Sequence, residues 1–220
     1  MKIVHTADWH VGKTIKGKSR ATEYREVLEE MKEFLRREKV DLLLVAGDLF
    51  DSTAPSAESE DIVYNFFHDI SRMDLAAVVI AGNHDSGLRF EAISNLMALA
   101  GVTMRGFFSS EDRCRHIVKI RNGGKVQHVQ LVLVPFVPER SFVRSEDLIS
   151  QEKGKLGGIY SREMGNLLRK LCADRPPKSA NIIVSHLLMH GSKPGGGEKH
   201  LYLGDNYAVH PDEIPENIDY

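Results

Sequence analysis

The sequence predicts an α/β protein built around a mostly parallel sheet with helices on its faces. In residues 1–100, short runs of aliphatic and β-branched residues alternate with longer segments of helical periodicity. Parallel strands need such long crossover connections, whereas antiparallel strands do not. Near residue 123 an Asn-Gly-Gly segment lies between two apolar runs, which is typical of a hairpin between antiparallel strands.

The first half is expected to alternate between strands and helices. The strands are predicted at 2–6, 41–47 and 75–82. The helices are predicted at 21–38, 57–71 and 87–100, and Ser56 is the expected N-cap of the second. Helical spacing predicts the apolar sides of the first two helices: Tyr24, Val27, Leu28, Met31, Phe34 and Leu35 in one, and Ile62, Val63, Phe66 and Phe67 in the other.

The second half is expected to be more mixed. The runs 116–120 and 126–136 flank the Asn-Gly-Gly turn and form the predicted hairpin. A helix is predicted at 159–173 and a strand at 181–186, and the chain after residue 190 is expected to be mostly loop.

Composition limits the class of protein. A chain of 220 residues fits one domain with a sizeable core. The formal net charge of −2 argues against a nucleic-acid binder held by bulk charge, but not against a local basic patch. Cys114 and Cys172 form no CxxC pair and indicate free thiols in a reducing compartment. Neither a signal sequence nor a membrane-spanning run is evident, so we expect a cytoplasmic protein without a membrane partner.

Four of the predicted strands end in polar residues. The set comprises Asp8 and His10, then Asp48, then Asn83, His84 and Asp85, and finally His186. Ligands of open α/β sheets bind beyond the carboxyl ends of the strands, so these side chains are expected on one rim. Carboxylate and amide oxygens together with imidazole suit Mn²⁺, Fe²⁺ or Zn²⁺. A carboxylate such as Asp48 can bridge two ions ~3.5–4 Å apart, as in two-metal phosphate-ester chemistry.

The other polar residues of these strand ends suggest supporting roles. Asn83 would add a neutral oxygen, which leaves the site able to accept an anionic substrate. His84 is expected to face the substrate and to stabilise or protonate the leaving oxygen. Asp85 could orient a neighbouring imidazole. Asp51 is expected either to order its loop or to contact a metal ligand without binding the metal itself.

The segments "DWH", "GDLFD", "GNHD" and "SH", in this order, resemble the calcineurin-like metallophosphoesterase superfamily. The longer segments "HTADWHVGK", "VAGDLFDSTAPS" and "AGNHDS" resemble its SbcD family of nucleases, over the whole of residues 1–220. The resemblance implies a two-sheet α/β sandwich and two divalent ions, usually Mn²⁺. It assigns Asp8, His10 and Asp48 to the first ion, Asp48, Asn83 and His186 to the second, and catalysis to His84.

The resemblance also implies activity and partners. These are exonuclease action on duplex ends and endonuclease action on hairpins or single strands, in DNA break repair and recombination. Family members continue past the position of Tyr220 into a Gly-His-x-His motif, a capping domain and a segment that docks an SbcC-type SMC-like ATPase. We therefore expect residues 1–220 to be a nuclease domain that stops before that motif, with weakened or no activity alone.

Three further features are less specific. Lys13, Lys16, Lys18 and Arg20 follow the first motif and either contact DNA phosphates or are merely solvated. His190 could reach the rim. Tyr64, Phe67, Leu96 and Met97 offer apolar surface either for a homodimer or for the core.

Two alternatives to a nuclease stay open. One is a phosphomonoesterase or small-molecule phosphodiesterase on the same scaffold, although "GDLFDST" lacks the Arg that phosphatases of this superfamily carry soon after the second motif. The other is a dimerising piece that binds metal poorly and has no activity.

Overall fold

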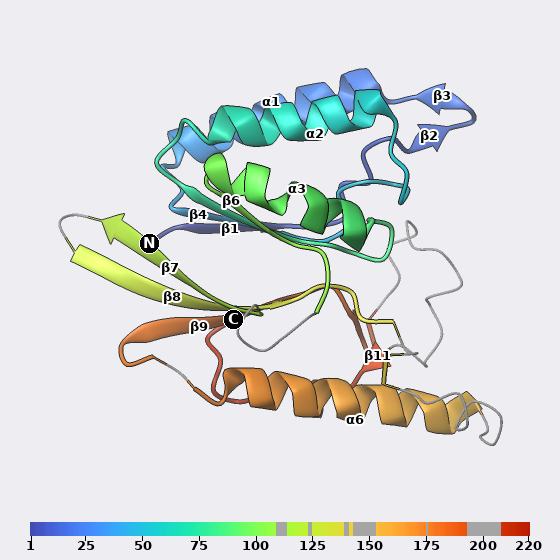
Figure 1. Ribbon diagram of the computed structural model, residues 1–220, viewed down its shortest axis with the longest axis vertical. Coiled ribbons are helices and arrows are strands. Elements are labelled where there is room, and N and C mark those ends of the chain that lie inside the picture. The colour runs from blue at the N-terminus through green and yellow to red at the C-terminus, as the bar shows by residue number, and fades with distance from the viewer. Residues whose placement is uncertain (109–113, 123–124, 139–140, 143–152, 175, 193–207) are drawn as a thin grey trace.

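The computed structural model describes residues 1–108, 114–122, 125–138, 141–142, 153–174, 176–192 and 208–220. These residues form four layers, with three helices, two sheets and one further helix stacked in that order (Figure 1). This arrangement is a two-sheet α/β sandwich, as the sequence resemblance implied.

The first sheet is fully parallel, with strand order β1-β4-β5-β6. Its elements alternate along the chain as β1 (Ile3–Thr6), α1 (Ala21–Arg37), β4 (Leu42–Ala46), α2 (Ala57–Ile70), β5 (Ala76–Ile80), α3 (Gly87–Leu99) and β6 (Val102–Arg105). Because successive strands are added in one direction and crossovers are right-handed, all three helices cover the same face. The opposite face is left for the second sheet (Figure 1).

The second sheet has the order β7-β8-β9, comprising Arg115–Asn122, Lys125–Val134 and Ser179–Ser185. β7 and β8 pair as the predicted antiparallel hairpin, and β9 joins β8 in parallel. The crossover between β8 and β9 contains α6 (Lys153–Cys172), which covers the outer face of this sheet (Figure 1).

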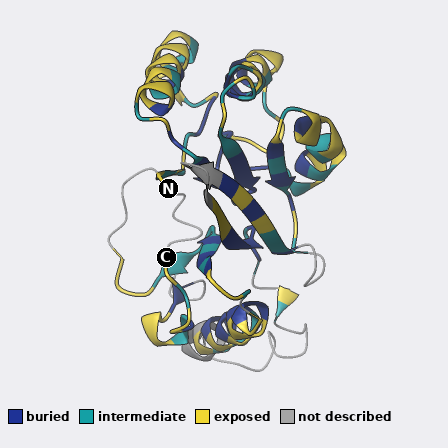
Figure 2. Cartoon of the chain, turned by 90° about the vertical axis from the view of Figure 1, so that its left-hand side faces the viewer, coloured by how far each residue is buried: buried dark blue, intermediate teal, exposed yellow. Residues whose placement is uncertain are grey.

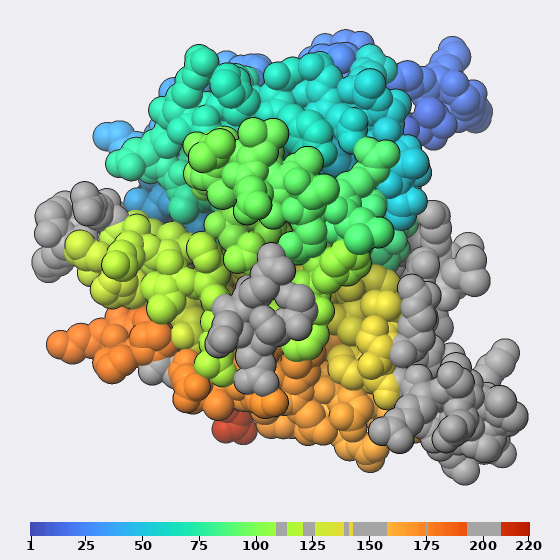
Figure 3. Space-filling model, viewed as in Figure 1, coloured from blue at the N-terminus to red at the C-terminus, as the bar shows by residue number. Residues whose placement is uncertain are grey.

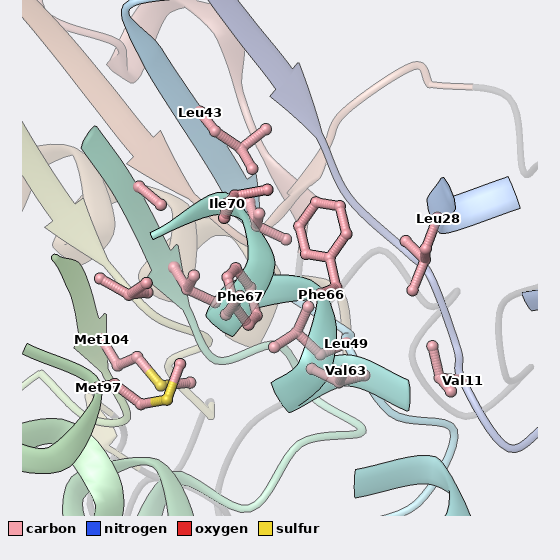
Figure 4. Close-up of a cluster of buried hydrophobic side chains, with 14 of the residues drawn as sticks. Val11, Leu28, Leu43, Leu49, Val63, Phe66, Phe67, Ile70, Met97 and Met104 are labelled. Carbon is pink, nitrogen blue, oxygen red and sulfur yellow. The ribbon is translucent and has the colours of Figure 1, made fainter. Parts of the chain in front are cut away.

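Three hydrophobic clusters hold the layers together. One lies between α1–α3 and the first sheet, one between the two sheets, and one between the second sheet and α6. Figure 4 shows Met97 beside Met104 in the first cluster, to which Phe67 also belongs. Figure 2 shows the corresponding pattern, in which the helices are buried toward the sheets and exposed outward.

Several small elements were not predicted. β2 (Thr14–Ile15) and β3 (Lys18–Ser19) form a hairpin in the segment that carries the basic residues after the first motif. Its turn residues, Lys16 and Gly17, have φ angles of 50° and 76°, as two-residue hairpin turns with matching twist require. The hairpin projects from the upper part of the molecule (Figures 1 and 3). β10 (Leu188–Met189) lies in a stretch for which no element was predicted, and β11 (Ala208–Val209) and the short helix η4 (Pro211–Glu213) fall in the segment after residue 190 that was expected to be mostly loop.

Two predictions about helices were wrong. α6 begins at Lys153, six residues before the predicted start at 159, because glycines in this stretch lowered its apparent helix propensity. In α1, Val27 and Phe34 were placed on the buried side, but they are 56% and 41% exposed. Only Leu28 and Leu35 of that helix are buried, because α1 contacts the layer beneath along a narrow stripe. None of the described helices is long and apolar enough to cross a membrane.

Candidate metal centre

The loops that follow β1 and β4 run side by side and are cross-linked by backbone hydrogen bonds. The amide of Asp8 donates to the carbonyl of Gly47 (3.1 Å), and the amide of His10 donates to the carbonyl of Asp48 (3.0 Å). Asp8, His10 and Asp48 have φ angles of 56°, 48° and 53°. Left-handed conformations are uncommon for residues other than glycine, so their concentration here marks a backbone held in place by its surroundings.

Two glycines allow the strand ends to approach closely. A Cβ on Gly82 would lie 2.1 Å from Oδ1 of Asp48, and a Cβ on Gly47 would lie 2.4 Å from Nδ1 of His186. Gly47 also has a φ of +96°. Both positions therefore require glycine, because any larger residue would displace a side chain of the rim.

Asp48 lies at the centre of the site and is 2% exposed. Its Oδ1 accepts a hydrogen bond from the backbone amide of His84 (2.8 Å). Its Oδ2 is approached by three imidazole nitrogens, the Nε2 atoms of His10 (3.7 Å), His84 (4.0 Å) and His186 (3.7 Å). None of these three contacts is short enough for a hydrogen bond.

The opposite nitrogen of each imidazole faces an oxygen of the scaffold. Nδ1 of His186 lies 2.8 Å from the carbonyl oxygen of Ala46, and Nδ1 of His84 lies 3.0 Å from the carbonyl oxygen of Asp51. A carbonyl oxygen only accepts, so in the neutral rings Nδ1 carries the proton and Nε2 presents a lone pair. Nδ1 of His10 makes no hydrogen bond to the described residues, although Oδ1 of Asp51 lies 3.5 Å from it.

At His84 and His186, lone pairs therefore face the rim without protons between them and their neighbours. Oδ1 of Asn83 lies 2.9 Å from Nε2 of His186, and Oδ1 of Asp8 lies 3.9 Å from Nε2 of His10. Burial lowers the pKa of His10, although the charge of Asp48 opposes this shift. The lowered pKa favours the neutral ring that a metal requires. Two ligand atoms bound at ~2.1 Å to one ion lie roughly 3–4 Å apart, which is the spacing seen here.

The donors fall into two overlapping groups that share Asp48. One contains His10, Asp48 and His84, and the other contains Asp8, Asp48 and His186; within each group the ligand atoms lie within 4.8 Å of one another. The sequence-predicted residues Asp8, His10, Asp48, Asn83, His84 and His186 are thus all brought together. Their oxygen and nitrogen atoms fit hard or borderline divalent cations.

Asp85 organises the backbone around the centre. Its carboxylate accepts hydrogen bonds from the amides of Gly82 (2.9 Å), Leu49 (3.2 Å) and Phe50 (3.0 Å), which ties the loop after β5 to the loop after β4. Burial raises the pKa of Asp85 to about 6, although these three amides oppose the shift. The contacts to imidazole Nδ1 atoms come instead from Asp51 and Ala46. Residue types alone do not reveal such contacts, because two of them are made by backbone carbonyls.

The basic candidates belong to the β2–β3 hairpin or flank it, and this segment follows His10 in the sequence. Lys13, Lys16 and Lys18 are part of or adjoin this hairpin, which begins four residues after His10. Arg20 is already engaged, since its guanidinium pairs with Glu23 and lies 5.7 Å from the centroid of the Tyr24 ring. His190 is exposed, and its ring centroid lies 5.5 Å from that of His210.

Comparisons with known proteins agree with this geometry. The family model described as calcineurin-like phosphoesterase matches residues 1–210. The SbcD subunit of the nuclease SbcCD from Rhodobacter capsulatus is 33% identical, over 98% of this chain and 55% of its own length. The proteins of the same name from Bacillus subtilis and Escherichia coli K12 are 29% and 28% identical, over 100% and 98% of this chain and 55% and 53% of their own lengths.

The chain therefore spans about half the length of the curated relatives it matches. The family match covers nearly all of it, and the polar strand ends that carried the sequence resemblance meet at one rim. Members of this family are phosphoester hydrolases that bind divalent metal. The chain belongs to the calcineurin-like phosphoesterase family.

Proposed function

We propose that this protein is a metal-dependent DNA nuclease of the SbcD type, which hydrolyses phosphodiesters in DNA break repair and recombination. One observation carries the proposal: the Nε2 atoms of His10, His84 and His186 surround one carboxylate oxygen of Asp48 at 3.7–4.0 Å. Lone pairs at this spacing repel one another unless cations lie among them. The curated relatives, which match nearly the whole chain, are named as parts of a nuclease.

Two divalent ions, most suitably Mn²⁺, are proposed to share Asp48, which belongs to both donor groups. In our proposal Asp8, His10 and Asp48 hold one ion, and Asp48, Asn83 and His186 hold the other. When bound, such ions supply positive charge to the phosphate oxygens and favour ionisation of water near neutral pH. Asp48 supports both positions because its Oδ1 is fixed by the amide of His84, while Oδ2 faces the other donors.

His84 is proposed to act on the leaving oxygen rather than as a ligand. The carbonyl of Asp51 receives its Nδ1 proton at 3.0 Å, which directs Nε2 toward the centre. When His84 is protonated, Nε2–H can donate to the oxygen that departs from phosphorus. Its ring lies edge-on to His10, with centroids 4.6 Å apart, so this proton would be delivered beside the first ion.

The substrate and partner assignments follow from the surroundings and the relatives. We propose that the lysines of the β2–β3 hairpin contact DNA phosphates, because the hairpin follows the His10 loop in the sequence and its strands are exposed. Duplex ends, hairpins and single strands are the proposed substrates. The relatives are named as one component of SbcCD, which supports an SbcC-type ATPase as partner.

Homodimerisation is proposed through the exposed side of α3. The sequence offered Tyr64, Phe67, Leu96 and Met97 for this surface, and not all of them are available. Phe67 and Met97 are 0% and 7% exposed and belong to the core, so they offer no interface. Leu88, Leu96 and Leu99 on α3 are 75%, 66% and 86% exposed. Three leucines exposed on one helix form an apolar surface that pairing with a second copy would bury.

The experiment measures Mn²⁺ binding and nucleotide release in the unaltered protein and in three variants. His84→Ser should retain Mn²⁺ affinity within a few-fold and lose at least a hundredfold in release of nucleotides from duplex ends. Asp48→Asn should lose both. His128→Ser, which alters an exposed histidine of β8, is the matched control and should change neither.

Each outcome decides between the candidates. Loss of Mn²⁺ binding in His84→Ser would make His84 a ligand and overturn its proposed role. Faster turnover of an aryl phosphomonoester than of DNA would favour the phosphatase alternative. Tight Mn²⁺ binding without hydrolysis of either substrate would contradict the nuclease proposal and favour a scaffold.

A further inference from the structure

A pocket of about 540 Å³ opens directly beside the metal centre. One wall is formed by residues of the loop after β5, including Gly82 and Asn83. The other walls come from the chain after β6 and the chain after β8, which belong to different sheets. Figure 1 shows the chain after β6 running from the upper sheet toward the lower one. The pocket is rich in aromatic side chains: Phe107, Phe108, Phe136 and Phe142.

Two of these rings lie outside the three hydrophobic clusters. Phe142 contacts Tyr160, with ring centroids 5.7 Å apart, and Phe108 and Phe142 both pack against the cluster under the second sheet. By contrast, Phe107 is 44% exposed, and neither Phe107 nor Phe136 belongs to any of the three clusters. The Phe136 ring lies edge-on to His186, with centroids 6.4 Å apart. These two rings therefore face the pocket that adjoins the centre.

The backbone holds this wall in position. A Cβ on Gly106 would lie 2.1 Å from the carbonyl oxygen of Gly87, so the chain before Phe107 meets the start of α3 backbone to backbone. The amide of Phe136 donates to the carbonyl of Ala81 (2.9 Å), which anchors Phe136 behind the loop that carries Asn83. Fixed backbone at both rings means that the pocket is present before any ligand binds.

The chemistry of the walls selects an uncharged, flat ligand. Among the described lining residues the only ionisable group is Asp85, and both of its oxygens already accept from backbone amides. None of these described lining residues carries a positive charge that would bind a phosphate. Phenylalanine faces stack with planar aromatic rings, and the amide of Asn83 and the hydroxyl of Ser141 add polar contacts at the edge.

We propose that this pocket is a base-binding subsite, in which an unstacked nucleobase lies against Phe107 and Phe136 while its phosphodiester sits at the metal centre. The inference rests on the proposed nuclease function and specifies its substrate further. Stacking tolerates every base, so the subsite selects unpaired nucleotides rather than a sequence. It favours ends and single strands, because a base within a duplex must first leave the stack.

The test is a double-mutant cycle. It removes the base from the ligand and the aromatic ring from the protein, separately and together. Phosphorothioate dinucleotides resist hydrolysis and present a single linkage to the centre. Dithymidine and a dinucleotide with both bases replaced by hydrogen are titrated calorimetrically with Mn²⁺ present. Phe107→Ala should weaken dithymidine binding roughly 5- to 150-fold and leave binding of the base-free compound unchanged.

Three further variants sharpen the result. Phe107→Tyr should retain affinity, because it keeps the aromatic face. Phe136→Leu keeps apolar volume but should still weaken dithymidine binding selectively. Phe34→Ala is the matched control, since Phe34 is 41% exposed but lies on α1 and lines none of this pocket. It should bind both dinucleotides like the unaltered protein.

The failure of the subsite can be distinguished from failure of the nuclease proposal. If both dinucleotides bind with Mn²⁺, lose binding in Asp48→Asn, and respond equally to Phe107→Ala, the subsite is overturned and the nuclease proposal stands. If neither dinucleotide binds in a Mn²⁺-dependent manner, both fall. Loss of self-association in Phe107→Ala, without selective loss of the base-bearing ligand, would assign this wall to a protein contact and overturn the subsite.

Discussion

Substitution of Gly47 by alanine tests whether the close approach of strand ends positions the metal centre. Gly47 has a φ of +96°, and a Cβ there would lie 2.4 Å from Nδ1 of His186. Gly101 is a natural control, because its φ is +71° and a Cβ there meets no atom within 4 Å. Both alanines incur the left-handed backbone cost, but only the alanine at Gly47 collides with a proposed ligand.

The magnitudes separate accordingly. A Cβ in the left-handed region costs about 1–2 kcal/mol, so Gly101→Ala should lower the free energy of unfolding by that amount. Overpacking adds about 1–3 kcal/mol, so Gly47→Ala should lower it by about 2–5 kcal/mol in total. Both variants stay folded wherever the starting stability exceeds about 5 kcal/mol, which is the lower end of the typical 5–15 kcal/mol.

Equilibrium unfolding in urea gives the stability, and calorimetric titration with Mn²⁺ gives the affinity. Gly101→Ala should bind Mn²⁺ like the unaltered protein, whereas Gly47→Ala should bind at least tenfold more weakly because His186 must move. If the two variants lost the same stability and bound Mn²⁺ equally well, contact between Gly47 and His186 would have no part in building the site.

Three further predictions concern the scaffold. Ser56→Ala should lower the free energy of unfolding by about 0.5–2 kcal/mol, because the Ser56 hydroxyl accepts from the amide of Ser59 (3.2 Å) and caps α2; urea unfolding measures the loss. Leu28→Ala should cost about 2–5 kcal/mol in the same assay, whereas Val27→Ser should stay within about 0.5 kcal/mol, since these neighbours are 6% and 56% exposed. The Lys32 ammonium, hydrogen-bonded to Asp69, lowers the pKa of that carboxyl below its usual 3.8, so the pair stabilises the fold above that pH and loses its effect as pH falls through the lowered pKa. Asp69→Asn should therefore cost up to about 1 kcal/mol at neutral pH and nothing once Asp69 is protonated, which unfolding at a series of pH values would show.

The sequence was sufficient for the first sheet and for most of the rim. β1, β4 and β5 lie close to their predicted bounds because each is a short apolar run followed by a clear helix. In a parallel sheet the strands share a direction, so polar residues after each of them must meet at the same edge. Asp8, His10, Asp48, Asn83 and His84 follow from that rule alone.

His186 lies at the rim because of packing between the two sheets, which the local sequence does not reveal. We expected its strand to share a rim with the others, but β9 belongs to the second sheet. Its end arrives beside Asn83 because the two sheets stack through the cluster containing Leu44 and Val184. The sheet that a strand joins depends on long-range packing. A short apolar run in the sequence is compatible with either sheet, so it does not predict which one the strand joins.

The supporting contacts were the least predictable part. Ala46 and Asp51 hold imidazoles through their carbonyl oxygens, which every residue has, so no residue pattern signals them. The aromatic wall is assembled from residues near 107 and 136, on chains that leave different sheets. Single phenylalanines in loops are common and predict no function by themselves. A binding role is indicated only when the structure shows several of them around one pocket.

The backbone of the rim is strained at the residues that carry the donors. Three of the six non-glycine residues with positive φ in the described chain are Asp8, His10 and Asp48. Each such conformation costs about 1–3 kcal/mol unless its surroundings compensate. The hydrogen bonds between the loops after β1 and β4, and the three amides bound by Asp85, provide such compensation. A backbone held in this way brings the carboxylates and imidazoles together, and cations bound among their converging lone pairs would relieve the repulsion that remains.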